Sequence, residues 1–119
     1  MKHCGTQPIE TPRLLLRRFE REDQMAMYQN WAGSPIVTQY LTWEAHPSPE
    51  ESLKVLCEWE KKYRKKNFYE WAIVLKEIGE PIGSIGAMPI SGKSCFEVGY
   101  CIGQKWWGQG IAGEALKSV

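Results

Sequence analysis

A predicted strand runs directly into a glycine-rich turn at residues 95–115, which have the sequence CFEVGYCIGQKWWGQGIAGEA. Three glycines fall within residues 108–113, and a helical stretch follows at 114–119. The first N–H groups of a helix have no partner within it and attract anions. Glycine has no Cβ, so a phosphate can lie against the main chain. The stretch therefore predicts a diphosphate cradle built from main-chain amides.

Two other interpretations of these glycines stay open. The spacing Gly108-x-Gly110-x-x-Gly113 matches the dinucleotide-binding fingerprint, but that fingerprint requires a parallel βαβ unit and an acidic residue about twenty positions later. Here the preceding strands are predicted to be antiparallel, and only six residues follow Gly113. A purely structural turn is the second alternative. Glu114 follows the last glycine where a P-loop would have lysine, which argues against nucleoside triphosphate hydrolysis.

Working outward, the sequence predicts an α+β fold with one sheet and helices on its faces. The expected order is a strand at 13–19, a helix at 20–32, a loop at 34–47, a helix at 49–65, strands at 69–75, 82–88 and 95–102, and a helix opening near Gln109. The helix at 49–65 has a start signature, in which Ser48 caps, Pro49 takes the first helical position and Glu51 reaches back to the cap amide.

The last three predicted strands form the centre of this fold. Short turns separate them, so we expect an antiparallel meander. Alternation in the first of them places Trp71, Ile73 and Leu75 on one side and Ala72 and Val74 on the other. The second strand is thinned by two glycines, at positions 83 and 86, which permit close backbone approach or a bulge.

Composition limits the possible classes of protein. The 119 residues, 13.7 kDa, fit one small domain. Fifteen Lys and Arg against fourteen Asp and Glu give a net charge of +1, so the chain as a whole is not a strongly basic nucleic-acid binder. No apolar run approaches a bilayer span and the N-terminus has no hydrophobic signal segment, so we expect a cytoplasmic protein with no membrane partner.

Few residues are of types that bind metals or act in histidine-based catalysis. The four cysteines are dispersed and only His3 and His46 are present, so we expect free thiols and no metal site. A basic run at 61–66 predicts the solvated end of a helix, where cations complement the dipole. Nucleic-acid or ribosome contact through this run is the alternative that stays open.

The order of elements, with EVGYCI at 97–102 followed by WGQGIA at 107–112, resembles the GNAT superfamily of acyl-CoA-dependent N-acyltransferases. Three further features resemble the branch containing the ribosomal-protein alanine N-acetyltransferases: TPRL at 11–14, YLTW at 40–43 and WWGQG at 106–110. Trp107 stands where the superfamily usually has Gln or Arg, which looks usual for this branch. The resemblance runs from about Thr11 to the end of the sequence.

The resemblance implies that acetyl-CoA is the acetyl donor. Main-chain groups of the predicted strand at 95–102 would pair with its pantetheine arm, and the glycine-rich turn would hold its diphosphate. The residues that match these cofactor-binding positions are Tyr100, Cys101, Ile102, Gly108, Gln109, Gly110, Ile111, Ala112 and Gly113. Tyr40 and Trp43 would line the acceptor pocket, because the corresponding loop does so in the family; covering the core is the alternative role for both.

The implied reaction is direct attack of a primary amine, from a peptide or protein N-terminus or a small molecule, on a thioester carbonyl. It requires a group that accepts the amine's proton. Glu97 is our candidate base, because desolvation on the cofactor strand would raise its pKa toward neutrality; an exposed or ion-paired Glu97 is the alternative. A covalent acyl-enzyme at Cys101 is less favoured, because no base is recognisable beside it.

The family continues beyond this last helix with further strands, so residues 1–119 resemble the front part of its fold, a single partial acetyl-CoA-binding domain. A missing C-terminal segment, or a second copy of the chain, would then complete the sheet. A non-catalytic CoA-binding or interaction module is therefore the alternative function.

Overall fold

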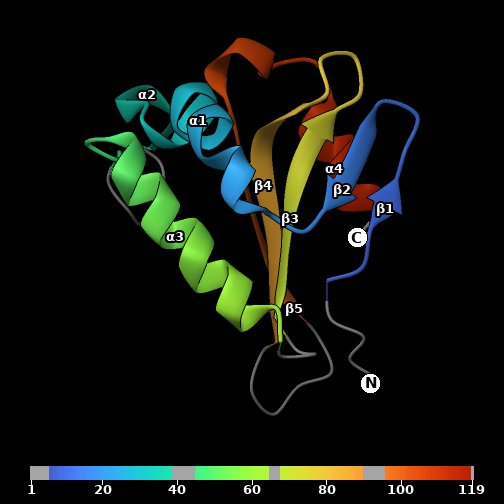
Figure 1. Ribbon diagram of the computed structural model, residues 1–119. Coiled ribbons are helices and arrows are strands. Elements are labelled where there is room, and N and C mark those ends of the chain that lie inside the picture. Colours follow the sequence, from blue (N-terminus) through green and yellow to red (C-terminus); the bar gives the residue numbers. More distant parts are fainter. Residues whose placement is uncertain (1–5, 39–44, 65–67, 90–95, 119) are drawn as a thin grey trace.

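The computed structural model describes residues 6–38, 45–64, 68–89 and 96–118 (Figure 1). Its centre is a five-stranded sheet in the order β1-β2-β3-β4-β5, in which every neighbouring pair is antiparallel. The strands are β1 (Ile9–Glu10), β2 (Leu14–Arg17), β3 (Tyr69–Leu75), β4 (Glu80–Pro89) and β5 (Phe96–Ile102). The predicted meander is confirmed as β3, β4 and β5. The two-residue β1 was not predicted, because it is too short to show a period.

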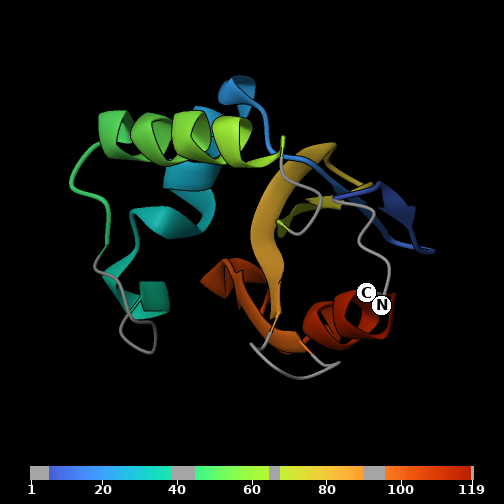
Figure 2. The same cartoon turned by 90° about the horizontal axis from the view of Figure 1, so that it is seen from below.

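Helices cover both faces of this sheet, as Figure 2 shows from below. They are η1 (Arg21–Asp23), α1 (Gln24–Met27), η2 (Tyr28–Ala32), α2 (Pro35–Thr38), α3 (Pro49–Lys62), η3 (Gln104–Trp106) and α4 (Ile111–Ser118). The segments from η1 to α3 lie on one side and α4 lies on the other. Within the described ranges, no helix is long and apolar enough to cross a bilayer.

The expected continuous helix at 20–32 is wrong in detail. It begins as a 3-10 turn, becomes α-helical and ends as a π-helical segment, where the Gly33 amide donates to the Tyr28 carbonyl at 2.9 Å. The loop expected at 34–47 contains the short helix α2. Packing against the sheet decides both features, because Trp31 and Val37 are buried in the same cluster.

The start of α3 also differs from the expectation. Pro49 takes the first helical position as predicted, but the Ser48 hydroxyl makes no capping bond; instead the Glu51 amide donates to the Ser48 carbonyl at 3.2 Å. The Glu50 carboxylate interacts with its own amide and with the Ser48 hydroxyl, which lower the pKa of Glu50. The predicted capping box is therefore wrong, because the Ser48 hydroxyl bonds to the nearer Glu50 carboxylate instead of to a helix amide.

Two hydrophobic clusters lie on opposite faces of the sheet, as the strand periodicity predicts. Trp71, Ile73 and Leu75 pack toward α4, whereas Ala72 and Val74 pack toward α3. The last two residues of β5 divide in the same way: Ile102 packs with the α4-side cluster and Cys101 with the α3-side cluster. The end of β5 therefore contacts both faces of the molecule.

The two glycines of β4 allow close approach, as predicted. A Cβ at Gly83 would lie 2.2 Å from the Cys101 carbonyl oxygen, and one at Gly86 would lie 2.1 Å from Oε2 of Glu70. Gly83 therefore lets the β5 backbone approach, and Gly86 leaves the space that a carboxyl group occupies.

Candidate active site

The outer edge of β5 is open within the described residues, because β5 pairs only with β4 there. The Gly103 amide donates to the Ile82 carbonyl at 2.9 Å. This hydrogen bond fixes which residues of β5 direct their main-chain N–H and C=O groups toward β4. Since antiparallel ladders alternate, Cys101 directs its main-chain groups to β4, and Tyr100 and Ile102 direct theirs to the open edge. Of the three predicted pantetheine-binding residues, two therefore present main-chain groups there.

A tight loop carries the chain from β5 to α4. The Trp107 indole N–H donates to the Ile102 carbonyl at 2.7 Å and holds the loop against the strand end. Gly108 and Gly110 have φ angles of 78° and 75°. Residues with a side chain rarely adopt this conformation, so the loop requires glycine at both positions. A Cβ at Gly108 would meet no described atom within 4 Å, so the main chain there is open to a ligand.

Helix α4 begins where this loop ends. The Glu114 amide donates to the Gly110 carbonyl at 3.1 Å, which is the first hydrogen bond of the helix. The amides of Ile111, Ala112 and Gly113 therefore precede the helical ladder, and none of them meets a protein acceptor in the described part of the chain. Ile111 is buried in the α4-side cluster and anchors the helix start. These amides give the helix start the donors that an anion needs.

A cavity of about 450 Å³ lies along the β5 edge and this loop. It is lined by Val37, Tyr100, Cys101, Ile102, Trp106, Trp107, Gly108, Gly110, Ile111 and Ala112. Seven of the nine predicted cofactor residues are among them; Gln109 and Gly113 belong to the same loop and helix start but do not line the cavity. Two of the lining aromatics are about half exposed, Tyr100 at 49% and Trp107 at 45%. Such surface is available for a ligand to cover.

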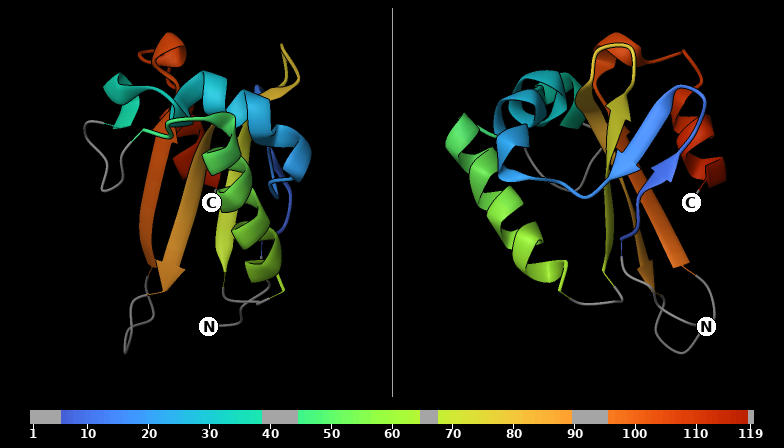
Figure 3. Two further views of the ribbon diagram at one scale, coloured as in Figure 1. Left: turned by 60° about the vertical axis from the view of Figure 1, so that its left-hand side comes forward. Right: turned by 45° about the vertical axis from the view of Figure 1, so that its right-hand side comes forward.

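An ion-pair network ties the loop to the start of β2, beside which α4 lies in the right-hand view of Figure 3. Arg13 donates to Glu114 at 2.7 Å and to the Gln109 carbonyl at 2.9 Å, and Thr11 donates to the same Glu114 carboxylate. The Thr11 hydroxyl and the Arg13 guanidinium lower the pKa of Glu114 to about 2. Arg13 therefore holds both sides of the glycine turn, a role that sequence reasoning missed.

The structure describes the predicted catalytic and acceptor residues only in part. Glu97 lies in β5 opposite Met88, four residues from Cys101, and its side chain is outside the described set. Tyr40 and Trp43 lie outside the described residues. Burial raises the pKa of the Cys101 thiol to about 11, which disfavours the thiolate that covalent catalysis requires. In the described ranges, no three His, Cys, Asp or Glu side chains form a metal-binding group.

A second cavity, of about 280 Å³, lies on the α3 side of the sheet. It is lined by Met27, Trp31, His46, Val55, Trp59, Glu70 and Ser84. Burial raises the pKa of Glu70 to about 7, and the nearby Ser84 hydroxyl and Lys62 ammonium oppose that rise. Sequence reasoning missed Glu70 as well. The available signal was a carboxylate on the Ala72 and Val74 side of an otherwise apolar strand.

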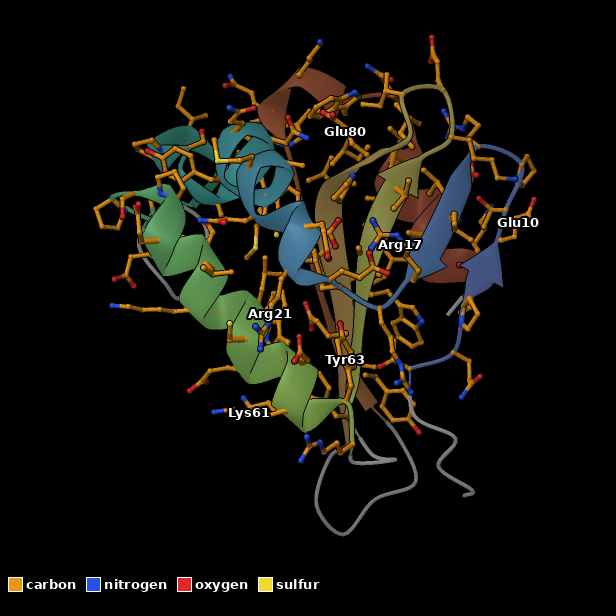
Figure 4. The ribbon with its side chains drawn as sticks, in the orientation of Figure 1. Glu10, Arg17, Arg21, Lys61, Tyr63 and Glu80 are labelled. Atoms are coloured by element: carbon orange, nitrogen blue, oxygen red, sulfur yellow. The ribbon has the colours of Figure 1, made fainter. Side chains whose placement is uncertain are left out.

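The described part of the basic run, residues 61–64, lies at the end of α3, as the solvated-helix interpretation predicts. Lys61 and Lys62 lie in its last turn and are exposed, and the Lys62 ammonium lies 5.8 Å from the centre of the Phe68 ring. Figure 4 shows Lys61 pointing away from the sheet. This position complements the helix dipole.

The fold and this site define a class of protein, an α+β domain in which the described strands leave an open edge beside a glycine-rich loop. The sequence matches the family model of the acetyltransferase (GNAT) domain over residues 13–119. YoaA of Bacillus subtilis, an uncharacterized N-acetyltransferase, is 30% identical over 112 residues, which are 93% of this chain and 63% of that protein.

Two solved structures share the fold at 22% identity. A GNAT-family acetyltransferase from Bacillus anthracis has a TM-score of 0.78 and is matched over 94% of this chain and 63% of its own. A putative ribosomal-protein-serine acetyltransferase from Vibrio cholerae has a TM-score of 0.79 and is matched over 92% and 62%.

The chain belongs to the GNAT acetyltransferase family. Both the resemblance and the α+β fold class expected from the sequence are confirmed. The chain spans 63% of the length of the Bacillus subtilis relative, less than two thirds.

Proposed function

We propose that this chain binds acetyl-CoA along the β5 edge and the glycine turn and transfers its acetyl group to a primary amine. The observation that carries the proposal is the 450 Å³ cavity, which joins the open edge of β5 to the unpaired amides at the start of α4. A thioester arm needs main-chain partners and a diphosphate needs clustered N–H donors. Both kinds of partner face one cavity here.

The residues present fit this cofactor. The amides of Ile111, Ala112 and Gly113 would hold the diphosphate, with Gly108 and Gly110 giving it access to the main chain. The Tyr100 amide and carbonyl and the Ile102 amide would hold the pantetheine arm, since the Ile102 carbonyl already accepts from Trp107. The bound cofactor supplies the acetyl group as a thioester.

The chain's own groups would supply proton transfer and charge stabilisation. We propose Glu97 as the acceptor of the amine's proton, because it lies on the same strand as the cofactor-facing groups. An edge amide of β5 would stabilise negative charge that develops on the carbonyl oxygen. We propose a protein or peptide N-terminus as the acceptor, since a ribosomal-protein acetyltransferase is among the structural neighbours; Tyr40 and Trp43 would contact it.

CoA binding without turnover is the second candidate. It is favoured by the open edge of β5 in the described residues, which leaves one wall of the cleft to be supplied from elsewhere. Light scattering, intact mass and an acetylation assay on the same sample separate the two candidates. Turnover by a monomer of 13.7 kDa would exclude this second candidate.

Calorimetry with acetyl-CoA tests the proposal, with the variant pair Tyr100→Pro and Tyr100→Ala. Both variants remove the phenol ring, but only proline removes the main-chain N–H at the open edge. This N–H does not bond to β4, so its loss leaves the β4–β5 ladder intact. We expect saturable binding by the wild type and a further loss of about tenfold in affinity for proline over alanine, which is about 1.4 kcal/mol. Equal affinities of the two variants would reject the pantetheine assignment, and no binding by the folded wild type would reject the proposed function.

A further inference from the structure

The second cavity combines apolar walls with a single carboxyl group. Met27, Trp31, Val55 and Trp59 supply most of its lining, and the carboxylate is that of Glu70. Such walls exclude water and strengthen any charge interaction inside. Aromatic faces beside a carboxylate are the surroundings that favour an ammonium ion over an anion or a neutral group.

Glu70 is held rigidly by its main chain. The Tyr63 hydroxyl donates to the Glu70 carbonyl at 2.8 Å, and the Glu70 amide donates to the Thr6 hydroxyl at 3.2 Å. Figure 4 shows Tyr63 at the end of α3, against the sheet. The missing side chain of Gly86 leaves the space that the carboxyl group fills. The carboxyl group is therefore placed before any ligand arrives.

The titratable groups around this carboxyl leave it without a close cationic partner among the described residues. Lys62 acts on it through its charge and not through a hydrogen bond, and Tyr63 and Cys101 both have pKa values raised by burial, so they are neutral at pH 7. Burial lowers the pKa of His46, which lines the same cavity and meets the Ser52 hydroxyl at 2.7 Å. A cationic ligand would therefore supply the positive counter-charge that the Glu70 carboxylate lacks among the described residues.

The two cavities meet across one contact. Cys101 lines the cofactor cavity, Ser84 lines the second cavity, and their side chains lie 3.2 Å apart. In the neighbouring row of the sheet, Glu70 pairs with Gly86 and Gly86 pairs with Gly99. A Cβ at Gly99 would meet no described atom within 4 Å. Two strand spacings, roughly 10 Å, separate the Glu70 and β5 backbones, and no Cβ stands between them.

We propose that the second cavity binds the N-terminal residue of the acceptor, a protonated primary amine with a small apolar side chain, with Glu70 as its counter-charge. The row of Gly86 and Gly99 then leads the amine to the cofactor edge of β5. This inference rests on the proposed function for its role in acetyl transfer, but the binding of the ammonium does not depend on acetyl-CoA. Glu70 acts here as an acceptor-binding residue, and Glu97 keeps the proposed role of base.

A titration of the wild-type protein with n-butylammonium chloride tests the site, with 1-butanol as the neutral probe of the same shape. Carbon-detected NMR follows the Glu70 carboxyl, and the assigned amides of Gly86 and Gly99 report on the row beside it. We expect n-butylammonium to lower the pKa of Glu70 by at least one unit and to shift both amides in a saturable way. Equal responses to both probes, or no response, would overturn the proposal.

A kinetic test uses Glu70→Gln in the protein that carries its full chain, with Glu58→Gln as the control, because Glu58 is an exposed carboxylate of α3. We expect Glu70→Gln to raise KM for the amine at least tenfold with the Kd of acetyl-CoA unchanged, and Glu58→Gln to change neither. If acetyl-CoA binds but Glu70→Gln leaves KM unaltered, this inference fails alone. If acetyl-CoA does not bind, the proposed function fails, and the NMR titration still decides the ammonium site.

Discussion

The cavity along the β5 edge and the Glu70 cavity meet at the contact between Cys101 and Ser84 but are built in opposite ways. Residues 100–112 supply nine of the ten residues that line the first cavity, and the groups proposed to act there are main-chain amides and carbonyls. The second cavity takes its seven lining residues from segments between Met27 and Ser84, and its side chains carry the chemistry. A contiguous site is visible in a sequence, whereas an assembled one requires the fold.

The largest expected effect comes from Gly83, the residue before Ser84, whose side chain contacts Cys101 between the two regions. Gly83 faces Ile102 and precedes Ser84, and an added Cβ would lie 2.2 Å from the Cys101 carbonyl oxygen. Because that neighbour is backbone, Gly83→Ala forces β5 away and should lower the free energy of unfolding by about 1–3 kcal/mol. Urea unfolding measures this loss.

Gly99→Ala is the matched control for this strand contact. Its Cβ would meet no described atom within 4 Å, so we expect the free energy of unfolding to change by less than about 0.5 kcal/mol. Equal losses in the two variants would show that close approach at Gly83 does not hold the two regions together.

The next largest effect is expected from a negative charge placed at the start of α4. Gly113 is exposed, its φ is not positive, and a side chain there meets no described atom near its Cβ. Gly113→Asp favours the helix through its dipole but repels a diphosphate, whereas Gly113→Asn has nearly the same shape without charge. We expect acetyl-CoA affinity to be about tenfold lower for Asp than for Asn, about 1.4 kcal/mol, in calorimetry at low salt.

Salt provides the check on this comparison, since screening weakens repulsion between exposed charges. The difference between the two variants should shrink as ionic strength rises. Identical affinities for Asp and Asn at low salt would remove the diphosphate from the start of α4.

The smallest expected effect concerns the clamp between β2 and the glycine turn. Arg13 and Glu114 form a surface ion pair, so Arg13→Ala should cost less than about 1 kcal/mol of stability. It should nevertheless weaken acetyl-CoA binding a few-fold, because the Gln109 carbonyl loses its donor. Thermal unfolding and calorimetry separate the two effects.

Arg21→Ala is the control for the clamp. Arg21 pairs with Glu60 at 3.0 Å on the far side of the sheet, where both side chains are more than half exposed (Figure 4). We expect a similar small change in stability and no change in acetyl-CoA affinity. An affinity loss of the same size in both variants would mean that the Arg13 contact does not position the turn.

Local patterns account for the parts that sequence reasoning predicted. Alternation in residues 69–75 depends only on which face of a strand each side chain takes, and the clusters on the two faces follow it. A tight glycine turn before the last helix was predicted from the spacing of Gly108 and Gly110, and both have the positive φ that favours glycine; anion binding there stays a prediction. The meander followed from the short turns between its strands.

Contacts between distant segments account for the parts that were missed. Arg13 and Glu114 are 101 residues apart, and nothing in either neighbourhood indicates the other. The Ser48 cap was predicted from spacing, but the hydroxyl interacts with Glu50 instead. The helix at 20–32 changes its pitch near Trp31, where the side chain is fully buried against the sheet.

The sequence alone determined the family, the antiparallel meander and the glycine loop, because each depends on residues that are neighbours along the chain. Only the tertiary structure decided that Glu70 lines a cavity and that Arg13 holds the glycine turn. Burial and the pKa shift of a carboxyl group depend on what packs around it, and that packing comes from α1, α3 and the strand row as a whole.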